Sequence, residues 1–294
     1  DDLFANSLAD LEMCNISQFK ILTIEGARPI YRHPYRRSPN ENEIIKNEIE
    51  DLLRNGFIRK SRSPWGFPSM LVPKPNNQHR LVIDYRELNK ITKAHPFPIP
   101  RLNDIFDALR DAKWFTTVDL KAGFHQVEIH PESIEKTAFV VWCGHFEWTR
   151  LPFGLKNAPS EFCRLMYKLL GDLRNVIVYL DDICIFTKTQ QHLTVLTEVF
   201  KRLRKAKLKI NSKKCEWMKT EIKVLGHFIK NSTIKMDKSK RRSVAPHERG
   251  YTSSTLKGKS IGDPTSYDDG KSCTFKFIKA ISRQEFNFVL FFSN

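Results

Sequence analysis

Residues 176–186 read Val-Ile-Val-Tyr-Leu-Asp-Asp-Ile-Cys-Ile-Phe, and the predicted fold depends on them more than on any other segment. Two apolar runs rich in β-branched and aromatic residues flank Asp181 and Asp182, which predicts two buried strands with the acids at the tip of a hairpin. Adjacent carboxylates beside a core repel each other and lose hydration unless a cation shares the site. Mg²⁺ prefers such oxygen ligands and keeps open positions for substrate phosphates. A solvated Asp-Asp turn is the alternative interpretation, so the rest of the chain has to decide.

The bulk composition favours a soluble globular protein with a polyanionic partner. The 294 residues are 40% hydrophobic and 28% charged, and they carry a formal net charge of +16. Such a charge is typical of proteins that bind nucleic acid, although a basic protein with no specific partner is the alternative. The six cysteines show no C-x-x-C pairing and no zinc spacing with the nine histidines, which favours reduced thiols. No apolar run is long enough for a transmembrane helix, and no signal-peptide pattern is present.

A helix followed by a hairpin is predicted in the first third of the chain. Ser38-Pro39-Asn40-Glu41 matches a capping box with proline at the first helical position, so the helix begins there. Ser69–Val72 and Leu81–Tyr85 are expected strands, which places Lys74 and Arg80 near the two sides of the hairpin tip. Two cations in these positions can bind an anion such as a triphosphate, and two solvated loop cations are the alternative.

A third acid ends a predicted strand in the middle of the chain. Trp114–Leu120 has the composition of a strand, and Asp119 lies at its end. An acid in this position is either a turn residue or the third carboxylate of a metal site. Gln126–Ile129 and Thr137–Val141 are expected to form another hairpin.

The last two predicted helices complete the assignment of fold class. One begins near Asn157 and Pro159, and a longer one covers 190–206 with an apolar stripe that includes Leu193 and Leu203. Strands and helices alternate without the regular rhythm of a parallel sheet. The sequence therefore predicts an α+β fold, an antiparallel sheet with helices on one side.

Several motifs resemble those of reverse transcriptases. Tyr179-Leu180-Asp181-Asp182 resembles the Tyr-x-Asp-Asp box of that family. Further segments resemble, in the family's order, the fingers motif, the first catalytic box, the template-handling box and the primer grip: Arg80–Thr92, Asp119–Val127, Leu151–Pro159 and Val224–His227. Tyr31–Pro39 is similar to the entry segment of gypsy-type LTR retrotransposon polymerases.

The resemblance implies a right-hand polymerase fold, with fingers and palm interleaved over residues 27–237, an antiparallel palm sheet and packed helices. It implies a retrotransposon RNA-directed DNA polymerase, a nucleotidyltransferase that adds dNTPs to a primer 3′-hydroxyl on an RNA or DNA template. Such phosphoryl transfer depends on positioning and on charge neutralisation by two Mg²⁺ ions, for which Mn²⁺ can substitute. We expect an intracellular, cytoplasmic location, with virus-like particles or the nucleus as alternatives, and no membrane partner. Nothing in the sequence indicates an oligomeric state.

The resemblance also implies roles for individual residues. Asp119, Asp181 and Asp182 match the carboxylates that hold the metal ions. Lys214 matches a lysine that protonates the leaving pyrophosphate, with plain solvated charge as the alternative. Phe124 matches an aromatic gate that clashes with a ribonucleotide 2′-hydroxyl, and a core phenylalanine is the alternative. Lys74 and Arg80 match the cations that bind the triphosphate, and Phe153 matches a residue of the template-handling box that makes a steric contact. The expected primer grip consists of Val224, Leu225, Gly226 and His227.

Both ends of the chain depart from the family pattern. Residues 1–26 form an N-terminal extension with weak periodicity. Residues 238–294 are divergent and polar, so we expect this tail to be partly disordered and the thumb to be truncated or aberrant. The retained acids, gate and fingers cations favour an active polymerase. The C-terminal departure favours the alternative, a catalytically inactive, truncated retroelement remnant that only binds nucleic acid.

Overall fold

The computed structural model describes residues 2–73, 79–98, 100–179, 182–189, 191–224, 227–230 and 233–236. The chain divides into two units, the larger of which comprises residues up to Ile222 together with Ile229–Thr233. The expected tail, 238–294, and with it the expected thumb, lies outside the described residues. None of the described helices combines the length and apolarity that a membrane crossing needs.

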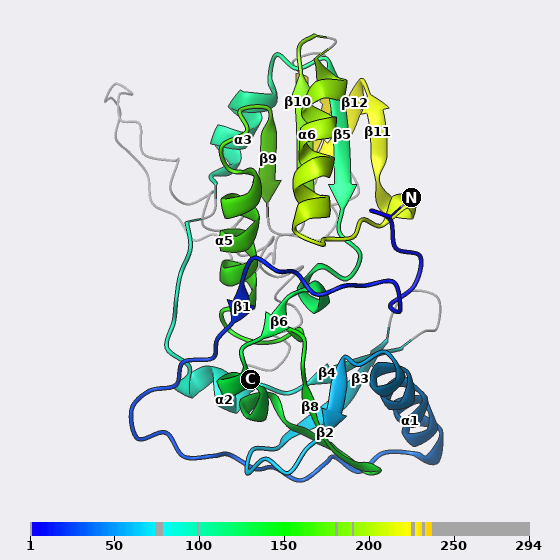
Figure 1. Cartoon of the computed structure of the whole chain (residues 1–294), viewed down its shortest axis with the longest axis vertical. Coiled ribbons are helices and arrows are strands. Elements are labelled where there is room, and N and C mark those ends of the chain that lie inside the picture. The colour runs from blue at the N-terminus through cyan, green and yellow to red at the C-terminus, as the bar shows by residue number, and fades with distance from the viewer. Residues whose placement is uncertain are drawn as a thin grey trace, which may run out of the picture. The chain divides into compact units, whose positions relative to one another are not determined.

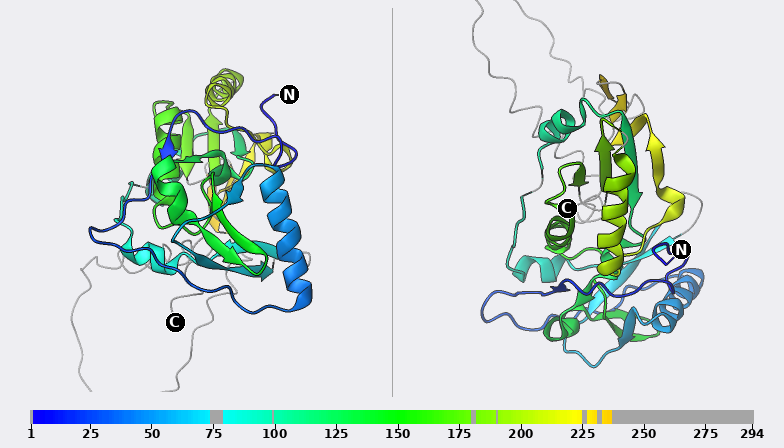
Figure 2. Two further views of the ribbon diagram at one scale, coloured as in Figure 1. Left: turned by 60° about the horizontal axis from the view of Figure 1, so that its bottom comes forward. Right: turned by 45° about the horizontal axis from the view of Figure 1, so that its top comes forward.

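A four-stranded antiparallel sheet in the larger unit contains the hairpin predicted from residues 176–186. Its strands are β5 (Trp114–Asp119), β9 (Val176–Tyr179), β10 (Asp182–Thr187) and β11 (Glu216–Lys219). The strand order is β11-β5-β10-β9, and Ile183 of β10 lies opposite both Val118 of β5 and Val178 of β9. Helices α5 (Ala158–Leu170) and α6 (His192–Lys205) pack against this sheet and against each other (Figures 1 and 2). The predicted palm hairpin and its helices are therefore confirmed.

A second sheet in the larger unit contains the hairpin that the resemblance assigns to the fingers. Its strands are β2 (Ile58–Lys60), β3 (Phe67–Pro73), β4 (His79–Ile83), β7 (Phe139–Val141) and β8 (Gly144–Trp148), in the order β2-β8-β7-β3-β4. Strands β3 and β7 are parallel, and the other pairs are antiparallel. Helix α1 (Pro39–Arg54) contacts β2 and β4 (Figure 2). It buries Ile45, Ile49 and Leu52. It begins with the predicted capping box, in which Ser38 and Glu41 bond reciprocally.

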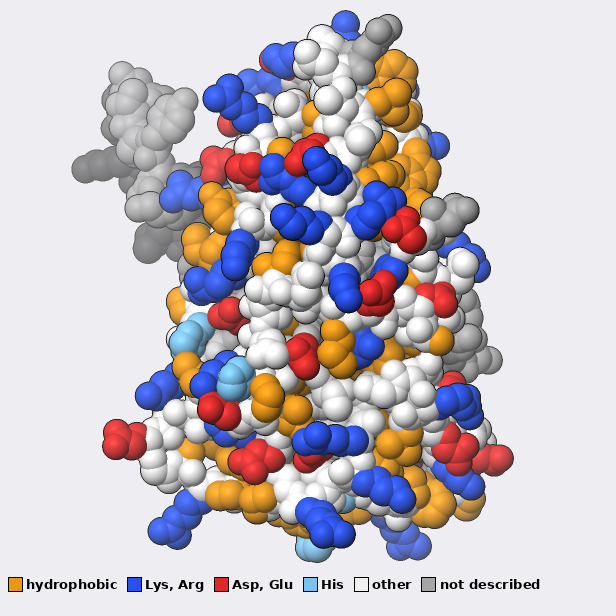
Figure 3. Space-filling view, in the orientation of Figure 1, with side chains coloured by type: hydrophobic (Ala, Val, Ile, Leu, Met, Phe, Trp, Pro, Cys, Tyr) orange, Lys and Arg blue, Asp and Glu red, His pale blue; other side chains and the backbone are white. Residues whose placement is uncertain are grey.

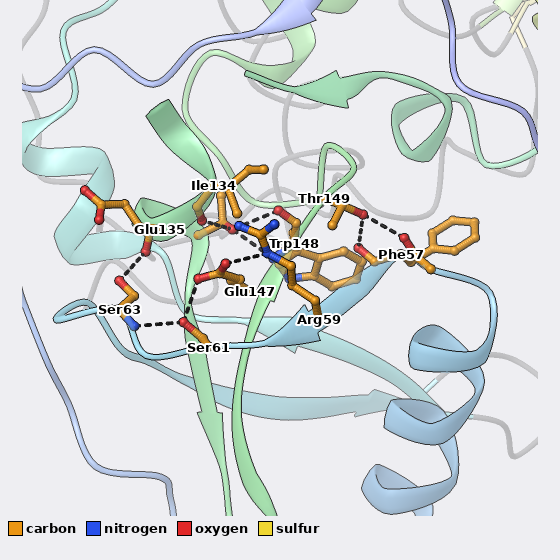
Figure 4. A network of polar contacts seen from close by, with 11 residues as sticks. Phe57, Arg59, Ser61, Ser63, Ile134, Glu135, Glu147, Trp148 and Thr149 are labelled. Carbon is orange, nitrogen blue, oxygen red and sulfur yellow. Dashed lines mark hydrogen bonds and ion pairs between the residues drawn. The ribbon is translucent and has the colours of Figure 1, made fainter. Parts of the chain in front are cut away.

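A polar network ties β2 to β8 at the surface of the fingers (Figure 4). Arg59 Nε donates to Glu147 Oε1 at 2.7 Å, and Ser61 Oγ donates to Glu147 Oε2 at 2.6 Å. The Glu147 carboxylate is buried, so these two bonds replace the water that it loses. Ser63 extends the network by donating to the carbonyl oxygen of Glu135 at 2.7 Å. A cavity of about 580 Å³ lies beside it, and none of the cavity's lining residues belongs to the predicted site.

The hairpin expected from Gln126–Ile129 and Thr137–Val141 is wrong. Strand β6 is only Glu128–Ile129, and it pairs in parallel with β1 (Gln18–Phe19) near the N-terminus. Strand β7 pairs instead with β3 and β8, and Thr137 belongs to the short helix η2 (Glu135–Thr137). Strand β6 pairs with β1, and β7 pairs with β3, each far away in the sequence. The local alternation of apolar and polar residues cannot reveal such distant partners.

The phase of α6 also differs from the prediction. Leu193, expected on the buried stripe, is 60% exposed, whereas His192 is fully buried. His192 Nε2 contacts Thr116 Oγ1 at 2.8 Å, and its Nδ1 contacts Thr187 Oγ1 at 3.0 Å. These two bonds to β5 and β10 turn the first helical residue inward, and burial lowers the pKa of His192.

The N-terminal extension contributes to the core of the larger unit. Leu3, Ala5, Leu11, Phe19 and Ile21 are buried. The Ala5 amide donates to the carbonyl oxygen of Ile210 at 3.0 Å, and the Ile210 amide donates to that of Leu3 at 2.9 Å. The weak periodicity of this segment reflects its extended course across the core.

The remaining elements are short helices and three further strands. They are α2 (Arg86–Ile91), α3 (Leu102–Leu109), η1 (Gly123–Gln126), α4 (Pro131–Ile134), η3 (Ser212–Lys214), β12 (Glu221–Val224), β13 (His227–Lys230) and β14 (Thr233–Met236). Strands β12, β13 and β14 form a three-stranded sheet in that order.

Candidate active site

Two of the three predicted acids meet across the palm sheet. Strand β5 ends at Asp119, β10 begins at Asp182, and these residues are direct partners in the antiparallel register. Directly opposite residues project from the same face, with Cβ atoms about 5 Å apart. Asp182 is exposed, and the side chain of Asp119 is 25% exposed. The third acid, Asp181, lies outside the described residues.

The turn before β11 surrounds Asp119 with polar contacts. Asn211 Nδ2 donates to Asp119 Oδ1 at 3.3 Å, and Lys214 Nζ lies 3.5 Å from Asp119 Oδ2. The Asp119 amide donates to Cys215 Sγ at 3.4 Å. Burial, reinforced by the negative charge of Asp119, raises the pKa of the Cys215 thiol, so the sulfur stays neutral beside the acid. The structure thus places Lys214 beside Asp119. The chemical role that the resemblance implies for Lys214 stays a prediction.

The donor chemistry of the acid pair fits a hard divalent cation. Asp119 and Asp182 present carboxylate oxygens on one face of the sheet, the ligands that Mg²⁺ prefers. Among the residues that the structure describes, no three His, Cys, Asp or Glu side chains are grouped to hold a metal ion. A three-carboxylate site would therefore require Asp181.

An aromatic cluster follows Asp119 along the chain. Ala122 has a left-handed backbone with φ of 46°, which turns the chain sharply into η1. The Phe124 ring then lies 5.2 Å from that of Phe153 and 5.1 Å from that of Phe162. The guanidinium of Arg80 lies 5.4 Å above the Phe153 ring. Phe153 therefore contacts both Arg80 and Phe124, so three predicted nucleotide-binding residues from different parts of the sequence lie in one cluster.

His125 belongs to the same cluster and was missed by the sequence analysis. Its ring stacks on Trp148 at 5.2 Å with an interplanar angle of 7°, and it meets Phe153 edge-on at 5.2 Å. Burial lowers the pKa of His125 to about 4. The ring is therefore neutral at pH 7, and Nδ1 donates to the Leu151 carbonyl oxygen at 3.1 Å. Its position beside Phe124 was the one available signal.

The remaining predicted residues are only partly described. Lys74, Leu225 and Gly226 lie outside the described residues. Val224 ends β12, and His227 begins β13, where its side chain is buried. The roles assigned to the primer-grip residues stay predictions.

A model of the reverse transcriptase (RNA-dependent DNA polymerase) family matches residues 72–229, which include both described acids and the aromatic cluster. The chain belongs to this family. The matched residues thus include the segments that resemble the fingers motif, the two catalytic boxes, the template-handling box and the primer grip.

Curated relatives of this reverse transcriptase chain are retrotransposon polyproteins. The retrovirus-related Pol polyprotein from transposon 297 of Drosophila melanogaster is 42% identical over 235 residues, which are 77% of this chain and 22% of the relative. That from transposon gypsy of the same organism is 36% identical over 233 residues, or 76% of this chain and 22% of the relative. The Tf2-3 polyprotein of Schizosaccharomyces pombe is 32% identical over 212 residues, or 70% and 16%. The chain spans about a fifth of the length of such relatives.

Solved structures of viral reverse transcriptases share the fold. The foamy viral protease-reverse transcriptase in complex with RNA/DNA hybrid matches with a TM-score of 0.73 and 28% identity, over 82% of this chain and 33% of that chain. The same viral protein in complex with double-stranded DNA matches with a TM-score of 0.75 and 27% identity, over 98% and 47%. The predicted α+β polymerase fold, with fingers and palm, is therefore confirmed.

Proposed function

We propose that this chain is the fingers-and-palm core of a gypsy-type retrotransposon reverse transcriptase. It extends a primer 3′-hydroxyl with deoxynucleoside triphosphates on an RNA or DNA template. The observation that carries the proposal is the direct pairing of Asp182 with Asp119 at one end of the palm sheet, in a chain of this family.

Mg²⁺ would be held by the carboxylates of Asp119, Asp181 and Asp182. Two bound Mg²⁺ ions would supply charge neutralisation for the attacking and leaving oxygens of an in-line displacement. Asp119 and Asp182 present their carboxyl groups on one face of the sheet, which would attract cations there. Lys214, whose side chain is 67% exposed beside Asp119, can move to donate a proton to a leaving oxygen.

The cluster of Arg80, Phe124 and Phe153 would bind the incoming nucleotide. Stacking on Phe153 holds the guanidinium of Arg80 in one place, which suits binding of a triphosphate. The Phe124 ring, fixed between Phe153 and Phe162, cannot withdraw without disturbing both neighbours. A ring so fixed would exclude a sugar that carries a 2′-hydroxyl.

The charge distribution supports a polynucleotide partner bound mainly through its phosphates. Lys and Arg side chains spread over the face shown in Figure 3, interspersed with acids, and the chain carries a net charge of +16. Contacts of this kind position a duplex without reading its sequence and weaken as salt rises.

Primer extension tests the proposal. Oligo(dT) annealed to poly(rA) or to poly(dA) is incubated with dTTP and Mg²⁺, with wild type beside Asp181→Asn. Extension by wild type alone is the expected result. Salt-sensitive binding of template–primer by a folded wild type that extends neither substrate would contradict the proposal and favour an inactive remnant.

A further inference from the structure

Asn211 contacts the predicted metal ligand Asp119 through both backbone and side chain. Its amide donates to the Asp119 carbonyl oxygen at 2.9 Å, and its side-chain Nδ2 donates to Asp119 Oδ1 at 3.3 Å. An amide oxygen in place of Nδ2 would repel the carboxylate, so only the donating orientation is stable there. The two bonds tie one end of β5 to a residue 92 positions further along the chain.

The segment that carries Asn211 is itself firmly placed. The Lys121 amide donates to the Lys209 carbonyl oxygen at 3.0 Å, and Ile210 forms an antiparallel bridge with Leu120. The fully buried Gln126 side chain bonds the amide of Lys209 at 2.6 Å and its carbonyl oxygen at 2.9 Å. Asn211 therefore has little freedom to follow a moving carboxylate, and it fixes the carboxylate instead.

The two oxygens of Asp119 have different surroundings. Oδ1 accepts the bond from Asn211, whereas Oδ2 faces Lys214 Nζ at 3.5 Å. The Lys214 side chain is 67% exposed, so its ion pair with Asp119 is screened by solvent and easily exchanged. Asn211 thus sets the rotation of the carboxylate so that Oδ2 points to the side where a cation can replace the lysine.

We infer that Asn211 is a positioning residue that orients the Asp119 carboxylate for a divalent cation. This inference rests on the proposed function, because it assumes that Asp119 is a metal ligand. Residues that orient metal ligands commonly change metal affinity or activity 10- to 100-fold when removed. Asn211 acts through its hydrogen bond to Asp119.

The test measures metal binding directly as well as activity. Binding of Mn²⁺ is followed by electron paramagnetic resonance in wild type, Asn211→Ala and Asn211→Leu, the last of which keeps the size of the side chain. Asn175→Ala is the matched control, because Asn175 Nδ2 donates to the Phe186 carbonyl oxygen in the same sheet, at the opposite end of β10. Thermal melting shows which variants fold.

The expected result is about 10-fold weaker Mn²⁺ binding in both Asn211 variants, with a matching rise in the Mg²⁺ concentration for half-maximal primer extension. Asn175→Ala should change neither. A merely structural role would lower the melting temperature and leave both metal dependences unchanged, which would overturn the inference while wild type still extends primers. A wild type that neither binds Mn²⁺ nor extends primers would overturn the inference and the proposed function together.

Discussion

Asp182 and Asp119 are direct cross-strand partners in the antiparallel pair of β10 and β5. Like charges directly opposite each other destabilise a sheet, so this pair costs stability that a hydrophobic pair would not. Lys214 offsets part of the repulsion at Asp119, but its exposed ion pair contributes little. A fold that keeps two acids in this position is best explained by a ligand that needs them, and a divalent cation fits the donor set.

Phe124→Val should admit ribonucleotides. Loss of the ring removes the surface that excludes a 2′-hydroxyl, and the preference for dTTP over UTP should fall roughly 10- to 100-fold. The measurement is kcat/KM for each nucleotide on one template. Phe124→Tyr keeps the ring and should keep the discrimination. An unchanged preference in Phe124→Val would remove the gate assignment.

His125 should make stability depend on pH. Its folded-state pKa of about 4 lies below the ordinary value of 6.5, so the unfolded chain binds the proton more readily. The contribution of neutral His125 to the free energy of unfolding is fully present above about pH 6.5 and is lost as the pH falls toward 4. The upper bound of this contribution is about 3 kcal/mol. The check is urea unfolding of wild type and His125→Phe at pH 7 and pH 4.5. From pH 7 to pH 4.5, wild type should lose more stability than His125→Phe. Equal losses in the two proteins would contradict a lowered pKa for His125.

Arg59→Ala should destabilise the fingers. Among the described residues, the buried Glu147 carboxylate then keeps only the Ser61 hydroxyl as a hydrogen-bond donor, at a cost of about 1–3 kcal/mol. Lys60→Ala, a change at an exposed residue of the same strand, should stay within about 0.5 kcal/mol of wild type. The measurement is the urea concentration at the unfolding midpoint of each variant. Similar midpoints for the two variants would show that the network around Glu147 contributes little to stability.

Elements with strong local signals were predictable from the sequence. The capping box of Ser38 and Glu41 places the start of α1, because both partners lie within four residues of each other. The apolar runs around Asp181 and Asp182 predict β9 and β10, since the two strands are neighbours in the sequence and pair with each other.

Features set by distant contacts were not predictable. Helix α2 forms where Asn89 Nδ2 donates to the Gly154 carbonyl oxygen and Asn89 Oδ1 accepts from the Lys156 amide, both far along the chain. In the candidate site, the hydrogen bond from Asn211 to Asp119 was likewise not predictable, because no sequence motif indicates it. Contact of Phe124 with Phe153 likewise depends on the tertiary fold, although the resemblance singled out both residues.

The most direct test of the account is the rate of single-nucleotide incorporation by Asp119→Asn at saturating template–primer. The substitution keeps the shape of the side chain and removes its charge, and Asp104→Asn, an exposed change on α3, is the matched control. We expect the rate to fall roughly a thousand-fold or more, equivalent to several kcal/mol of lost charge stabilisation, with template binding intact. A folded Asp119→Asn that incorporates nucleotide as fast as Asp104→Asn would contradict the assignment of the acid pair as the metal site.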